Sequence, residues 1–211
     1  MNASQLKLTM AFVAREMVAS EPLLTKADQV IGDGDHGIGM ERGFNAVIEL
    51  LDDNYQAEDV SVLMKDIGTT MMSTMGGASG AIFGTLFRAG AKQIKGAQNL
   101  DTETFHHFLA AGLAGVYKRG GAKPGDKTMI DALVAAVDYS KDLSGALENN
   151  IEDIAVIAQQ GLEATKDMIA TTGKAKTLGE RSLGHPDPGA ISMALIIAFM
   201  SQHINQQVAV A

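Results

Sequence analysis

The sequence predicts an all-α fold of eight helices in a single domain spanning residues 1–211. Apolar residues recur at intervals of three and four along most of the chain, and no segment shows the period-two alternation of a half-buried strand. The composition supports this prediction, because 12 methionines, no tryptophan and 5% aromatic residues leave a core made mainly of helix-forming Ala, Leu, Ile, Val and Met. Hydrophobic residues at 46% and charged residues at 20% are typical of a globular chain.

The first four helices are expected at residues 4–19, 40–51, 60–75 and 79–95. Ser4 is the candidate N-cap of the first helix. We expect Pro22 to end the segment that leads from this helix to the acidic loop. The third helix stops at the glycine pair 76–77. In the fourth helix, Gly84 and Gly90 are expected where a neighbouring helix comes too close for a side chain.

The last four helices are expected at residues 102–119, 127–139, 150–172 and 188–206. Asp126 is the candidate N-cap of the sixth helix, and Gly173 is the expected C-terminal stop of the seventh. Asp187 followed by Pro188 is a strong helix-start signature, because proline is tolerated in the first turn.

Composition also narrows the classes of function. A net charge of -8 argues against a nucleic-acid partner, and the absence of cysteine excludes disulfides and thiolate metal sites. The N-terminus lacks the pattern of a signal peptide, and the longest apolar run, residues 190–200, is too short to span a bilayer. We therefore expect a cytoplasmic protein with neither nucleic acid nor membrane as a partner.

The segment 28–40 is the strongest candidate for a functional site. It holds Asp28, Asp33, Asp35, His36 and four glycines within thirteen residues. Carboxylates this close repel one another by roughly 1 kcal/mol per pair even in water, so a cation is expected among them. Oxygen ligands without thiolates favour Mg²⁺ or Ca²⁺. The alternative is an acidic, glycine-rich turn exposed to solvent.

Three familiar motifs match parts of the sequence but fail on inspection. Residues 32–37 fit the glycine spacing of a dinucleotide-binding loop, but no strand precedes them. An EF-hand starting at Asp33 would place Phe44 at the position that requires a carboxylate. Residues 125–128 lack the glycine–lysine step of a Walker A loop.

Two further loops complete a predicted metal–phosphate site. The glycine turn 76–80 and the sequence Asp187-Pro188-Gly189 each open a helix, and main-chain N–H groups at a helix start bind phosphate oxygens. Phosphates bridged by Mg²⁺ would neutralise the three aspartates. His36 either contacts a phosphate or a metal ligand, or is simply a hydrogen-bonding residue of the loop; the glycines alone would also fit ordinary helix-breaking loops.

Four blocks of sequence resemble one known family. They are residues 31–37 (IGDGDHG), residues 76–85 (GGASGAIFGT), residues 124–129 (PGDKTM) and residues 178–190 (LGERSLGHPDPGA). In this order they resemble the ADP-binding L subunits of bacterial dihydroxyacetone kinases driven by the phosphoenolpyruvate phosphotransferase system. The resemblance implies an antiparallel up-and-down barrel of eight helices, with the nucleotide held by loops at one end.

The resemblance also implies roles for individual residues. Asp28, Asp33 and Asp35 would bind two Mg²⁺ ions that bridge the phosphates of ADP or ATP. The residues expected along the nucleotide are His36, Gly37, Ile38, Gly39, Ala78, Ser79, Gly120, Met129, Lys174, Asp187, Pro188 and Gly189. Two positions depart from the family pattern: Gly39 replaces a frequent Asn, and Lys174 and Lys176 precede the LGER block where relatives have an Arg. Lysine cannot make the bidentate phosphate contact of arginine. We therefore expect these two departures to affect how firmly the nucleotide is retained, and not whether it binds.

The implied function is that of a kinase subunit, with no catalytic residue beyond those that position metal and phosphate. ADP would be phosphorylated in place by a multiphosphoryl carrier protein, and the ATP would phosphorylate dihydroxyacetone bound on a separate K subunit. We also expect a homodimer. The alternatives are an ATP-dependent kinase subunit for another short-chain ketose and a nucleotide-loaded regulatory module that binds a transcription regulator; a Mg²⁺-dependent phosphohydrolase is weaker, because no separate general base is evident.

Overall fold

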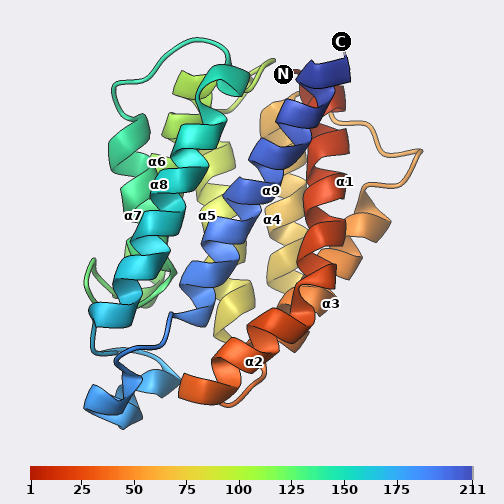
Figure 1. The fold of residues 1–211 in the computed structure, drawn as a ribbon. Coiled ribbons are helices and arrows are strands. Elements are labelled where there is room, and N and C mark those ends of the chain that lie inside the picture. Colours follow the sequence, from red (N-terminus) through yellow and green to blue (C-terminus); the bar gives the residue numbers. More distant parts are fainter. Residues whose placement is uncertain (211) are drawn as a thin grey trace.

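The protein is all-helical in a computed structural model that describes residues 1–210 (Figure 1). These residues form nine α-helices and three 3-10 helices, with no β-strand among them, so the predicted all-α class is confirmed. The α-helices are α1 (Ala3–Ala19), α2 (Glu21–Ile31), α3 (His36–Leu50), α4 (Val60–Thr74), α5 (Gly77–Gln93), α6 (Thr102–Gly120), α7 (Met129–Ser140), α8 (Ile151–Ala164) and α9 (Pro188–Val210). The 3-10 helices are η1 (Leu147–Asn149), η2 (Thr165–Asp167) and η3 (Lys174–Ser182).

Eight of the α-helices run alternately up and down and pack side by side in a closed ring. Each of α3 to α8 packs on the next helix in sequence, and α1 closes the ring by packing on both α9 and α3 (Figure 1). The short helix α2 lies across one end of the ring, against α3 and α9. The inward faces of the ring form one apolar core, as the helical spacing of the apolar residues predicts.

The sequence prediction misses α2. The sequence predicts that Pro22 ends the segment leading to the acidic loop. Pro22 is instead the second residue of α2, where a missing N–H group costs no hydrogen bond. As a result Asp28 lies in the last turns of a helix, and only residues 32–35 form the acidic turn. The next helix, α3, begins at His36 and not at Met40.

Two helix ends in the second half also differ from the prediction. Thr128, not Asp126, is the N-cap of α7: its hydroxyl accepts from the Ile130 N–H, and Asp131 accepts from the Thr128 N–H at 2.8 Å. Helix α8 ends at Ala164, and Gly173 lies beyond it in a loop that includes η2 and η3. The N-cap of α1 is Asn2 and not Ser4, since the Asn2 side chain accepts from the Gln5 N–H. The starts and ends of the other helices agree with the prediction to within about four residues.

Close helix packing at two glycines is confirmed. A Cβ atom at Gly90 would lie 2.5 Å from the Phe108 ring on α6, and one at Gly84 would lie 2.7 Å from the Met72 Cβ on α4. Both distances are far below van der Waals contact, so α5 approaches its two neighbours only because these side chains are absent. Among the described residues, no helix is long and apolar enough to cross a membrane.

Candidate functional site

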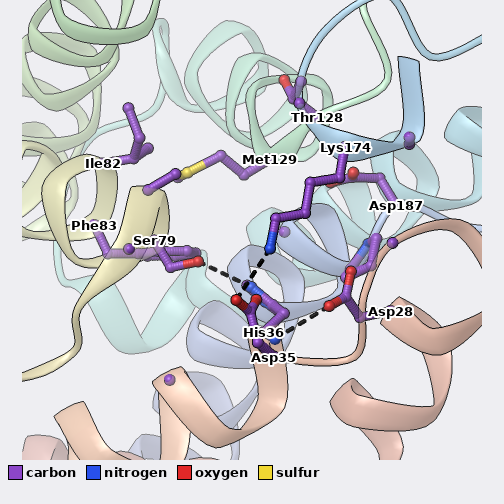
Figure 2. Close-up of a pocket in the computed structure, with 18 of the residues that line it drawn as sticks. Asp28, Asp35, His36, Ser79, Ile82, Phe83, Thr128, Met129, Lys174 and Asp187 are labelled. Carbon is purple, nitrogen blue, oxygen red and sulfur yellow. Dashed lines mark hydrogen bonds and ion pairs between the residues drawn. The ribbon is translucent and has the colours of Figure 1, made fainter. Parts of the chain in front are cut away.

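A cavity of about 620 Å³ opens at the end of the ring where α2 lies. Its wall is built from loops that are distant in sequence: the acidic turn 32–35, the α4–α5 turn, the α6–α7 loop and the segment between α8 and α9 (Figure 2). A volume of this size lies in the range of pockets that bind small organic ligands. The three loops singled out in the sequence therefore meet at one site.

The three aspartates form the acidic part of this wall. Carboxylate oxygens of Asp28, Asp33 and Asp35 all lie within 4.8 Å of one another. The Lys174 ammonium forms ion pairs with Asp33 and, at 3.1 Å, with Asp35. A cation therefore contacts two of the three carboxylates. The donor set is entirely oxygen, which fits a hard divalent ion such as Mg²⁺.

Asp28 is held in place by its neighbours. It is 9% exposed, and its carboxylate accepts a hydrogen bond from the His36 N–H at 3.1 Å. A Cβ atom at position 32 would lie only 2.0 Å from Asp28 Oδ1, so the carboxylate occupies the space that a side chain at Gly32 would fill. Gly32 thus belongs to the site although it offers no ligand atom.

His36 connects two serines from opposite sides of the site. Its Nδ1 lies 3.0 Å from Ser79 Oγ on α5, and its Nε2 lies 2.8 Å from Ser192 Oγ on α9. Burial lowers the pKa of the imidazole, which the nearby Asp28 carboxylate partly offsets. A neutral ring donates from one nitrogen and accepts at the other, so His36 orients the Ser79 hydroxyl at the cavity wall.

The start of α5 is suited to an anion. Gly76 and Gly77 have φ angles of 75° and 58°, which favour glycine, and no side chain caps the first N–H groups of the helix. Ala78 and Ser79 follow on the cavity side. Arg42, which the sequence prediction missed, donates to the Met75 carbonyl at 2.6 Å and supports this turn.

The start of α9 differs, because a side chain already caps it. Asp187 accepts from the Ala190 N–H at 2.7 Å, so a negative charge there would meet a carboxylate. Burial raises the pKa of Asp187 to about 7, and the nearby Asp131 adds to the rise, while main-chain N–H groups and Lys127 oppose it. The adjoining wall is apolar and includes Ile82, Phe83, Val116, Met129 and Ile130. An uncharged, flat group fits this side better than a phosphate does.

The structure brings nearly all predicted site residues to the cavity wall. Among the fifteen named, only Gly37 is not part of the wall; its Cα faces α2, where a Cβ would lie 2.3 Å from the Thr25 hydroxyl. The wall residues that sequence reasoning missed are mainly the apolar ones and Lys127. Their helical spacing indicated burial but not which buried face is open to a cavity.

Comparisons with known proteins agree with this geometry. Residues 30–202 match the family described as the DAK2 domain. The chain is 39% identical over 181 residues to the ADP-binding subunit DhaL of the PEP-dependent dihydroxyacetone kinase of Escherichia coli K12, covering 84% of this chain and 86% of that one. It is 33% identical to the L-erythrulose 1-kinase of Mycolicibacterium smegmatis, covering 89% of this chain but 33% of that enzyme.

A solved structure shows the same fold. The dihydroxyacetone kinase of C. freundii in complex with AMP-PNP and Mg²⁺ superimposes with a TM-score of 0.75 at 25% identity, over 96% of this chain and 34% of that one. The chain therefore spans about a third of the two longer kinases and 86% of the E. coli subunit. Sequence match, coverage and fold agree, and the chain belongs to the DAK2-domain family.

Proposed function

We propose that this protein is the nucleotide-binding subunit of a phosphoenolpyruvate-dependent dihydroxyacetone kinase. The observation that carries the proposal is the meeting of three aspartates with the uncapped start of α5 at one nucleotide-sized cavity. Membership of the DAK2-domain family and the name of the E. coli relative support the same activity.

Each part of the cavity has a distinct task in this proposal. Asp28, Asp33 and Asp35 hold two Mg²⁺ ions, which neutralise the phosphates and stabilise charge as the phosphoryl group moves. The N–H groups at the start of α5 and the hydroxyl of Ser79, oriented by His36, bind phosphate oxygens. The apolar wall beyond Met129 takes the adenine ring, and Asp187 stands beside the nucleoside.

The protein contributes to phosphoryl transfer mainly by positioning the phosphoryl group of the bound nucleotide. A phosphoryl transfer of this kind needs alignment and charge neutralisation more than covalent chemistry from the protein. The nucleotide fills the cavity, so the ketone is presented by a partner K subunit and the phosphoryl donor is a second, multiphosphoryl carrier protein. A homodimer, a transcription regulator as a further partner and a cytoplasmic location stay predictions.

Native mass spectrometry of protein purified with Mg²⁺ tests the proposal. We expect a mass that includes ADP and two Mg²⁺ ions, and loss of the metal in Asp33→Ala. Asp53→Ala, an exposed aspartate in the α3–α4 loop, is the matched control and should retain both ligands. Wild-type protein that carries no nucleotide and binds no added Mg-ADP would refute the proposal.

A second candidate differs in substrate and donor. Because the chain also matches part of an L-erythrulose kinase, a kinase subunit that uses free ATP for a tetrulose is the alternative. Bound ADP that persists through purification and is rephosphorylated in place favours the first proposal. Rapid exchange of bound nucleotide with free ATP favours the second.

A further inference from the structure

Lys127 is unusual among the lysines of this protein. It is 2% exposed and is the single buried lysine among the residues whose burial is described. Its main chain has a φ angle of 60°, a conformation that residues other than glycine rarely adopt. A long charged side chain in such a position requires contacts that compensate for its burial.

Those contacts are two main-chain carbonyls on separate segments. The Lys127 ammonium donates to the Thr165 carbonyl at 2.5 Å and to the His185 carbonyl at 2.6 Å. No carboxylate lies within ion-pair distance of it in the described part of the chain. The side chain is therefore fixed to the backbone just after α8 and just before α9, and not to another side chain.

The same two segments are joined by further hydrogen bonds. The Gly184 N–H donates to the Lys166 carbonyl at 2.8 Å, and the Asp187 N–H donates to the Thr165 hydroxyl at 3.0 Å. We call residues 165–166 and 184–187 the stem, and residues 167–183 the loop that it closes. Lys127 reaches this stem from the α6–α7 loop, so it ties the stem to a third part of the wall.

The position of several wall residues depends on this stem. The loop carries Lys174, whose ammonium contacts Asp33 and Asp35. The stem itself continues into residues 187–189, which form the wall beside Met129. Opening of the stem would move both groups away from the cavity at once.

We propose that Lys127 is a positioning residue whose ammonium holds the stem closed and thereby limits how fast the nucleotide leaves. The part of this inference that concerns nucleotide release rests on the proposed function. The part that concerns the stem does not, because its hydrogen bonds form within the chain alone.

Hydrogen exchange of the nucleotide-free chain tests the stem directly. Lys127→Met keeps an unbranched side chain but removes the charge and both donors, and Thr165→Val removes the hydroxyl that accepts from Asp187. In each variant we expect the Gly184 and Asp187 amides to exchange about tenfold faster or more, with little change in α5 and α6. Lys123→Met, an exposed lysine in the same α6–α7 loop, is the matched control.

Two exchange results would overturn the inference. One is unchanged exchange of the stem amides in Lys127→Met. The other is acceleration spread equally over α5 and α6, which would mean that the substitution weakens the whole fold. If Lys127→Met does not fold, Thr165→Val decides by the same two criteria, because its hydroxyl lies outside the cavity wall.

Release of a fluorescent ADP analogue in the presence of Mg²⁺ tests the consequence. We expect release about 10- to 100-fold faster in both single variants, and little further acceleration in the double variant, since both changes open one stem. Two results would refute the stem role and would mean that Lys127 acts on the nucleotide directly. One is release from Thr165→Val at the wild-type rate, and the other is a double variant in which the fold-changes of the two single variants multiply. A wild-type chain that binds no Mg-ADP would refute the proposed function, while the exchange data still decide on the stem.

Discussion

Replacing Gly32 with alanine should weaken metal binding without unfolding the protein. The new Cβ atom would lie 2.0 Å from Asp28 Oδ1 and 2.9 Å from its Cγ. An ordinary contact between such atoms is about 3.5 Å, so the carboxylate must move by more than about 1 Å. The two closest atoms belong to the Asp28 side chain, so the fold can adjust by rotating it, and the Asp28 main-chain oxygen at 3.0 Å needs to shift by only a few tenths of an ångström.

The expected magnitudes follow from this displacement. Metal coordination tolerates deviations of roughly 0.2 Å, so an Asp28 oxygen that moves by 1 Å is lost as a ligand. Changes that disturb the orientation of a ligand typically cost 10- to 100-fold in metal affinity, or about 1.4–2.8 kcal/mol. The free energy of unfolding should fall by less than about 1 kcal/mol, because the Asp28 end group can move aside.

Calorimetric titration of ADP at several Mg²⁺ concentrations measures the effect, and urea unfolding measures the stability. Asp53→Ala is the control, since Asp53 is exposed and lies outside the cavity wall. It should keep the wild-type dependence on Mg²⁺.

Wild-type dependence on Mg²⁺ in Gly32→Ala would refute the reasoning, because it would show that Asp28 is not a metal ligand. A decrease of several kcal/mol in the free energy of unfolding would refute the expected small effect on stability, because it would show that the fold cannot accommodate the new methyl group.

Three further predictions concern stability and nucleotide retention. A Cβ atom at Gly39 would make only an ordinary contact, 3.4 Å from the Met75 carbonyl oxygen, and Gly39 lines the cavity. Gly39→Asn should therefore be accommodated, raise stability by about 0.5 kcal/mol and slow ADP release, as measured by stopped-flow fluorescence. Asp187→Asn should stabilise the chain by roughly 2–4 kcal/mol at pH 8 and by almost nothing at pH 4, as measured by urea unfolding. The reason is that the pKa of Asp187 in the folded chain, about 7, exceeds its value in the unfolded chain. The stability of the wild-type chain therefore falls as the pH rises between these two pKa values. Gly90→Ala should destabilise the chain by about 2–3 kcal/mol at every pH, because its Cβ would lie 2.5 Å from Phe108.

Each of these has a clear contradicting result. Faster ADP release from Gly39→Asn would show that the side chain clashes with the nucleotide. A stability difference for Asp187→Asn that does not vary between pH 4 and pH 8 would show that the carboxyl titrates normally. Wild-type stability of Gly90→Ala would show that α5 and α6 can separate at little cost.

The helical class and most of the helices could be predicted from local sequence. Apolar residues on one face of each helix predict a helix without knowledge of its partners. In the structure, local caps such as Asp59 and Asp101 add to this signal. The same holds for the acidic cluster, because Asp28, Asp33 and Asp35 are close in sequence and their mutual repulsion needs no tertiary contact to infer.

The predicted helix starts and ends were wrong where a local sequence signal fits two different structures. Pro22 breaks a helix interior but is tolerated in a first turn, and here it lies in the first turn of α2. Asp126 is as good a candidate N-cap as Thr128, yet its carboxylate accepts from Lys123 and from the Thr171 hydroxyl in the loop. The apolar face of residues 150–172 continues past Ala164, where the stem contacts of Thr165 replace the helix.

The sequence by itself determined most of the helices, the acidic turn and the glycine-rich helix starts, because each depends on residues a few positions apart. Only the tertiary structure decided which of them meet. His36 reaches Ser192, Lys174 reaches Asp33, and Lys127 reaches Thr165 and His185, because the ring closes with α9 against α1 and brings all the loops of one end together. Contacts between residues so far apart in sequence depend on how whole helices pack, and no local pattern encodes them.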